Sequence, residues 1–161
     1  MKTKLILFIT VIITQSCAIM LNKDELTNER TDYTGNAFRL DGCYINNMNY
    51  KGQCWYNFFY RNGIMLTFND SCGAENVTEF SIDTKFEKTR TPWTIFHIDG
   101  DKVTVKYWTS YPELFTLDTA LDTYKIINDT TLSHLNTEGE TVYYNFKKFT
   151  SKPDSINPFI K

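Results

Sequence analysis

The chain contains few of the residue types on which catalytic and metal sites depend. It has two histidines and four cysteines, and none of them stands at the spacing of a zinc site. A glycine-rich phosphate loop, a Gly-x-Ser-x-Gly elbow and a His-Glu-x-x-His motif are also absent. We therefore predict a protein that is not an enzyme, with no catalytic residues, no metal and no cofactor. His97 and His134 are expected to lie at the surface.

Lysine and arginine are scattered and form no basic cluster. The chain has 17 basic and 19 acidic residues, and leaving out Lys2 and Lys4 gives 15 against 19, a net charge of −4. Nucleic-acid-binding domains concentrate Lys and Arg on one face. We therefore expect no nucleic-acid partner.

Long apolar runs are missing as well. The run over residues 5–13 is interrupted only by Thr10 and has about half the roughly 20 residues that a membrane-spanning helix needs. It follows Lys2 and Lys4 and ends before small residues, the three-part pattern of an export signal. Residues 1–17 are therefore predicted to be a signal peptide.

Two cleavage sites compete at the end of this signal. Ser16-Cys17 resembles the end of a bacterial lipobox, in which Cys17 is lipidated and attaches the protein to a membrane. This predicts a cell-envelope protein, an outer-membrane lipoprotein. Alternatively, cleavage after Ala18 releases a periplasmic or secreted protein.

The residues after the signal peptide are predicted to form one domain with a polar segment on each side. Residues 18–36 are polar without a sustained period and are predicted to form a flexible tether. Residues 37–150 carry the strand signals. Residues 151–161 contain Pro153 and Pro158, and are expected to be a tail packed on the domain.

Short alternating segments joined by turn residues predict an all-β fold. Turns are expected at Asn62-Gly63, Asp99-Gly100, Asn128-Asp129 and Glu138-Gly139. About eight strands in local hairpins indicate an antiparallel meander that forms a lipocalin-like barrel or a sandwich. In the second hairpin, the core face is predicted to carry Phe96, Ile98, Val103, Val105 and Tyr107.

The first hairpin has apolar side chains on both faces. With a two-residue loop at Asn62-Gly63, the core face carries Trp55, Phe59, Ile64, Leu66 and Phe68. The opposite face is then a possible binding surface, formed by Tyr56, Phe58, Tyr60 and Met65. The alternative is that the tail or the tether covers this face. The bulky inward set (Phe59, Phe68, Phe96, Tyr107, Phe146) favours a filled interior.

Three cysteines follow Cys17. An exported protein can form disulfides, and a Cys43–Cys54 bond is expected because these residues lie on neighbouring predicted strands. The alternative is that Cys43, Cys54 and Cys72 are all small buried side chains.

Four segments together resemble a group of small Bacteroidetes lipoproteins of unknown activity: RLDGCYIN, WTIFHIDGDKVTVKYW, YKIINDTTL and FKKFTSKPDSINPFIK. In that group the first motif usually ends in Asp-Gly-Tyr-Tyr, and Cys43 replaces one tyrosine here. Three triplets look like the O-glycosylation sites of these bacteria, with acceptors at Thr119, Thr130 and Ser155.

These features favour an envelope-anchored, non-enzymatic binding module for a protein partner or a small apolar ligand. A different class remains open, a glycoside- or ester-type hydrolase that uses Glu113 with Asp118 or Asp122 as paired carboxylates. A third is a structural component of the envelope.

Overall fold

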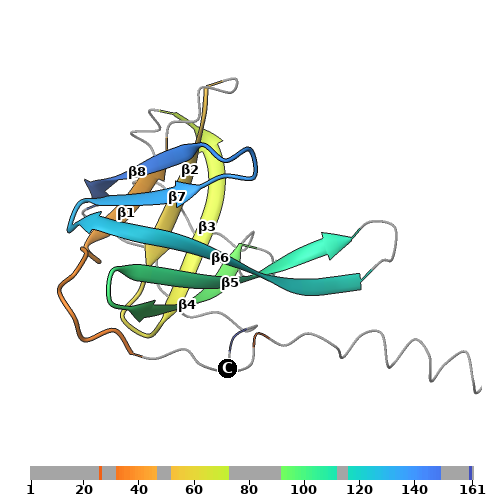
Figure 1. The fold of residues 1–161 in the computed structure, drawn as a ribbon, viewed down its shortest axis with the longest axis horizontal. Coiled ribbons are helices and arrows are strands. Elements are labelled where there is room, and N and C mark those ends of the chain that lie inside the picture. The colour runs from red at the N-terminus through yellow and green to blue at the C-terminus, as the bar shows by residue number, and fades with distance from the viewer. Residues whose placement is uncertain are drawn as a thin grey trace, which may run out of the picture.

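The protein forms a closed barrel of eight antiparallel strands (Figure 1). The computed structural model describes residues 26, 32–46, 52–72, 92–111, 116–149 and 160, and this part contains no helix. Each strand pairs with the next along the chain, and the last closes on the first. The all-β fold is therefore confirmed, and of the two predicted architectures the barrel is the one formed. The strands are β1 (Gly42–Asn46), β2 (Gln53–Phe59), β3 (Ile64–Ser71), β4 (Trp93–Asp99), β5 (Lys102–Tyr111), β6 (Thr116–Asn128), β7 (Thr131–Leu135) and β8 (Thr141–Lys148).

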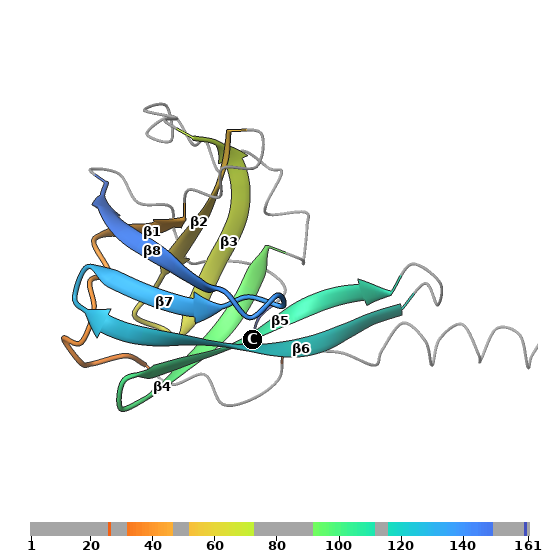
Figure 2. The same ribbon diagram turned by 45° about the horizontal axis from the view of Figure 1, so that its top comes forward.

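The strands differ widely in length. β5 and β6 pair at ten successive positions, and their hairpin projects beyond the other strands (Figures 1 and 2). β3 and β4 pair at only three positions, from Ile64↔Ile95 to Leu66↔Trp93. The far half of β3 therefore lies without a paired β4 neighbour.

The β4–β5 hairpin has the predicted faces. Asp99 pairs with Lys102 across a two-residue loop, and Gly100 has a φ of 59°, a conformation that glycine adopts readily. Phe96 and Val105 are paired and buried. The inward set predicted for these two strands is confirmed.

The loop between β2 and β3 is one residue longer than expected. The backbone N–H of Tyr60 donates to the Ile64 carbonyl at 2.9 Å, so the loop consists of residues 61–63. Gly63 has a φ of 76°, the left-handed conformation found in three-residue hairpin loops. Phe59 consequently pairs with Met65 instead of Leu66.

A shift of one residue moves every side chain of a strand to the opposite face. Met65 therefore points into the barrel, whereas the sequence placed it outside. The other three apolar residues of β3 join the outer face, which corrects their assignment to the core side: Ile64, Leu66 and Phe68.

Two separate apolar clusters result. The lumen cluster fills much of the barrel interior and contains Tyr33, Phe38, Tyr44, Phe59, Met65, Phe96, Val103, Val105, Tyr124, Leu132 and Tyr144. The outer cluster lies over β1 to β5 and contains Leu26, Cys43, Cys54, Tyr56, Phe58, Tyr60, Ile64, Leu66, Phe68, Trp93, Ile95, Trp108, Phe149 and Ile160.

The predicted binding surface is therefore not exposed. Tyr56, Phe58 and Tyr60 are all less than a tenth exposed, and Met65 lies on the other side of the sheet. Leu26, Phe149 and Ile160 come from outside the strands and pack in the same cluster. Residues near both ends of the chain thus provide a second layer over this face, as the alternative interpretation proposed.

Residues 18–36, predicted to form a flexible tether, pack on the barrel at two of the positions that the structure describes. Leu26 and Tyr33 are buried, at 2% and 9% exposure. Leu26 belongs to the outer cluster and Tyr33 to the lumen cluster. The chain before β1 is therefore packed on the barrel at both points.

The disulfide joins Cys54 to Cys72, which corrects the predicted Cys43–Cys54 pair. β1 and β2 pair in the register Tyr44↔Asn57, so Cys43 lies opposite Phe58. Cys54 is four residues farther along β2, about 13 Å away at the rise of a strand. A disulfide needs Cα atoms within about 7 Å. Those of Cys54 and Cys72 are 5.0 Å apart, and Cys43 stays buried outside the bond.

The segment before β1 closes one end of the barrel (Figure 1). The Tyr33 N–H donates to the Arg61 carbonyl at 2.7 Å, and the Arg39 N–H donates to the Asp129 carbonyl at 3.2 Å. The Tyr44 hydroxyl donates to the same Asp129 carbonyl at 2.7 Å. These bonds tie the segment to the β2–β3 and β6–β7 loops.

Candidate functional site

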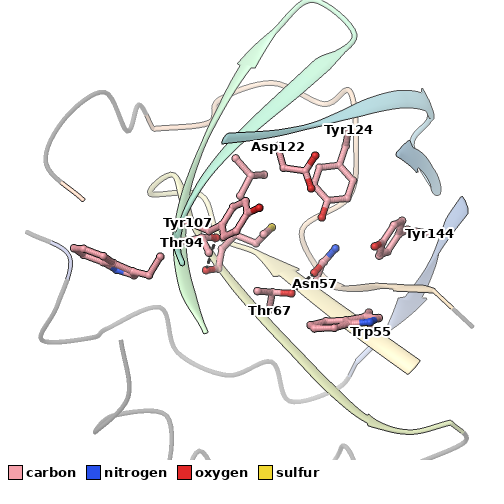
Figure 3. A pocket seen from close by; sticks show the side chains of 11 residues that line it. Trp55, Asn57, Thr67, Thr94, Tyr107, Asp122, Tyr124 and Tyr144 are labelled. Carbon is pink, nitrogen blue, oxygen red and sulfur yellow. Dashed lines mark hydrogen bonds between the residues drawn. The ribbon is translucent and has the colours of Figure 1, made fainter. Parts of the chain in front are cut away.

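A cavity of about 330 Å³ lies in the lumen (Figure 3). Side chains enter it from β2, β3, β4, β5, β6 and β8. At roughly 30 Å³ per water-sized group, it has room for about ten non-hydrogen atoms. The lining residues are Trp55, Asn57, Met65, Thr67, Thr94, Val105, Tyr107, Trp108, Asp122, Tyr124 and Tyr144.

The cavity exists because the two ends of the lumen carry different side chains. At the closed end, Phe38, Phe59 and Phe96 contact one another with ring centroids 5.1 to 6.2 Å apart. Toward the other end, the inward positions of β3 and β4 include the smaller Thr67 and Thr94. The predicted filled interior is therefore correct for the closed end only. Phe68, counted as inward from the sequence, belongs to the outer cluster.

Asn57 supplies a polar group deep in this cavity. Its side chain is 1% exposed, and its Oδ1 accepts a hydrogen bond from the Thr67 hydroxyl at 2.7 Å. Its Nδ2 makes no hydrogen bond of ordinary geometry within the described part of the chain, and it points toward Tyr124 (Figure 3). The Tyr124 hydroxyl is close enough to this amide for Asn57 to lower the Tyr124 pKa as a hydrogen-bonding neighbour. A ligand with a hydroxyl or carbonyl oxygen has a hydrogen-bond donor available in this amide.

Two tyrosine hydroxyls are held neutral beside Asn57. Burial raises the pKa of Tyr124 well above its usual value, and the charge of Asp122 acts in the same direction. The nearby Asn57 amide opposes this effect. Burial likewise raises the pKa of Tyr144. Both residues therefore present an uncharged hydroxyl and an aromatic ring.

Asp122 and His134 form a pair across β6 and β7. The His134 Nε2 lies 2.7 Å from Oδ1 of Asp122, and the Thr123 N–H donates to the same oxygen at 2.8 Å. The register explains the contact, because Tyr124 of β6 is paired with His134 of β7. The His134 side chain is only 18% exposed, so its prediction as a surface residue was wrong. His97 is exposed, as expected.

Both proposed hydrolytic pairs include Glu113, so the described residues do not test them. Glu113 lies outside the described residues. The backbone of Asp118 pairs with Thr109, four residues before Asp122 on the same strand. At the rise of a β-strand, the two Cα atoms are about 13 Å apart.

The predicted lipidation and O-glycosylation residues lie partly within and partly outside the described residues. Cys17 and Ser155 lie outside the described residues. Thr119 is half-buried on β6, and Thr130 is half-buried in the β6–β7 turn. The Thr130 N–H and hydroxyl each donate to the Asn128 side-chain oxygen at 2.9 Å, so this hydroxyl already has a partner.

The described residues offer neither a metal site nor a membrane-spanning helix. They contain no group of three metal-binding side chains and no helix of the length and hydropathy that crossing a membrane requires.

The sequence interpretation missed Asn57, Tyr124 and Tyr144 as parts of a site. Strand alternation was the available signal, since Trp55, Asn57 and Phe59 follow one another on one face. A polar residue between two aromatic ones on an inward face indicates a lumen that is not wholly apolar.

Comparison of the chain with protein-family models, curated proteins and solved structures finds no match. Fold and cavity together define the class of the protein: an eight-stranded up-and-down barrel with a lumen closed at one end.

Proposed function

We propose that this protein is a non-enzymatic binding module whose barrel lumen holds a small, largely apolar ligand. The observation that carries the proposal is the 330 Å³ cavity walled by aromatic rings, with a buried amide donor inside it. Small-molecule sites are commonly apolar cavities of about 300–1,000 Å³ with a few placed polar groups. A purely structural component has no need of such a cavity, which counts against that alternative.

The test uses benzyl alcohol, a neutral aromatic probe of eight non-hydrogen atoms. Titration is followed by amide chemical shifts and by isothermal calorimetry. Val105→Phe adds a ring at a cavity-lining position that is 1% exposed. We expect the purified protein to bind the probe, and the variant to bind it at least about tenfold more weakly, a change of about 1.4 kcal/mol.

Thr123→Phe is the matched control, because it adds the same ring at an exposed position of β6. Overpacking a core costs about 1–3 kcal/mol, so the amide spectrum of Val105→Phe must first show a folded barrel. Equal binding by the original protein and Val105→Phe, or no binding by either, contradicts the proposal.

We further propose that Cys17 is lipidated and anchors the barrel in the cell envelope, as in the Bacteroidetes lipoproteins that the sequence resembles. The support is the export signal ending at Ser16-Cys17. A protein with two or three acyl chains stays with the membrane, since each buried CH₂ contributes about 0.8 kcal/mol.

Cys17→Ser tests the anchor in a diderm host. We expect the original protein in the membrane fraction with the mass of added acyl chains, and the variant without that mass in the soluble or uncleaved fractions. A soluble original protein that begins at Ile19 instead supports cleavage after Ala18.

A further inference from the structure

We infer that the ligand of the lumen carries a positively charged amine, held between the carboxylate of Asp122 and the surrounding aromatic rings. This inference rests on the proposed binding function and specifies the chemical class of the ligand.

Charge in the cavity points to a cation. Asp122 is the one charged side chain among the residues that line the cavity, and no lysine or arginine lines it. His134, which contacts Asp122, is the nearest basic group of the described chain. Burial is the main cause of the raised pKa of both Tyr124 and Tyr144, and the charge of Asp122 adds to it in the same direction. A carboxylate ligand such as a fatty acid is repelled by this arrangement.

One oxygen of Asp122 remains available. His134 and the Thr123 N–H both bind Oδ1. Oδ2 accepts no hydrogen bond from the described residues. The first two contacts hold the side chain in place, and Asp122 remains about one-third exposed. An ammonium group placed at Oδ2 gains a charge-assisted hydrogen bond, which is about twice as strong as a neutral one.

Aromatic rings complete the proposed site. Asp122 and Tyr124 enter the cavity from β6 and Tyr107 enters it from β5, while Trp55 and Tyr144 enter it from β2 and β8 (Figure 3). Tyr124 and Tyr144 form an edge-to-face pair with centroids 5.4 Å apart. Ring faces attract a cation by their quadrupole, and this attraction strengthens when water is excluded. Carboxylate and rings therefore favour the same ligand charge.

Three soluble probes share one benzyl or phenyl frame and differ in charge: benzylammonium, benzyl alcohol and benzoate. Calorimetry on the folded protein is expected to rank the cation first, at least about tenfold tighter than the alcohol, with benzoate weakest. Asp122→Asn keeps the shape of the side chain and removes its charge. In that variant, the affinity for benzylammonium should fall about tenfold, while the affinity for benzyl alcohol should change less than about twofold.

Asp101→Asn is the matched control. It also removes one carboxylate, but Asp101 is exposed outside the lumen. Its Oδ2 lies 3.7 Å from Nζ of Lys125. This variant should bind benzylammonium as the original protein does. If Asp122→Asn fails to fold, the ranking of the three probes on the original protein still decides the question.

The outcomes separate the two proposals. Binding of benzyl alcohol as tight as that of benzylammonium overturns the amine inference and leaves the binding function standing. Failure of all three probes overturns both. If Asp101→Asn and Asp122→Asn lower the affinity for benzylammonium equally, the loss of affinity comes from the change in net charge. That result also overturns the amine site.

Discussion

Replacing Phe59 by alanine is expected to lower the free energy of unfolding by about 3–5 kcal/mol. Phe59 is 1% exposed and lies at the centre of the closed end of the lumen. Its ring meets Phe38 and Phe96 edge to face with centroids 5.1 Å apart, and Tyr44 at 5.8 Å. Alanine leaves these three rings facing a void that the surrounding strands cannot collapse to fill. Equilibrium unfolding in urea measures the loss.

Tyr143→Ala is the control for this prediction. Tyr143 is 55% exposed on β8, so removal of its ring should change stability by less than about 0.5 kcal/mol. A double-mutant cycle of Phe59→Ala with Phe38→Ala adds a second measurement. The two losses should differ from additivity by about 0.5–1.5 kcal/mol, because the rings are in contact. Additive losses contradict the packing of the segment before β1 into the barrel.

Turn chemistry allowed most of the fold to be predicted, but it did not determine loop length. Asp99-Gly100 and Asn62-Gly63 have the same kind of signature. The first forms a two-residue loop, with Asp99 opposite Lys102. The second lies at the end of a three-residue loop. Gly63 supplies a positive φ that both loop types use, so the sequence does not distinguish them. The single extra residue reversed the faces of β3 and moved Met65 into the lumen.

The binding site was harder to predict because it depends on contacts between distant segments. Alternation correctly placed Val105 and Tyr107 inward. It gave no sign that His134 meets Asp122, since that contact requires the register of β6 and β7. The coverage of the outer aromatic face was equally hidden, because Leu26 and Ile160 lie near opposite ends of the sequence. Periodicity assigns a residue to a face, and only the closed fold shows what lies against it.

Removal of the disulfide in Cys54→Ala/Cys72→Ala is expected to cost about 3 kcal/mol of stability. The bond joins residues 18 apart, and it restricts the unfolded chain more than the folded β2–β3 hairpin, which is already paired. Cys54 is 1% exposed in the outer cluster, so the same change also loses buried sulfur contacts. Urea unfolding of the oxidised protein measures the difference, and a reducing agent should lower the stability of the original protein but not that of the double variant.

Cys43→Ala separates the observed pairing from the one expected from sequence. Cys43 is fully buried beside the same cluster, so the variant should lose a modest amount of stability from packing and keep its response to reductant. Peptide mapping without reduction should recover the Cys54–Cys72 cross-link in this variant. If the cross-link disappears, or if stability no longer depends on reductant, the bond of the original protein includes Cys43, and the Cys54–Cys72 assignment is wrong. The strand register forbids a Cys43–Cys54 pair, since Cys43 lies opposite Phe58. The variant therefore tests the register of β1 against β2 as directly as it tests the disulfide.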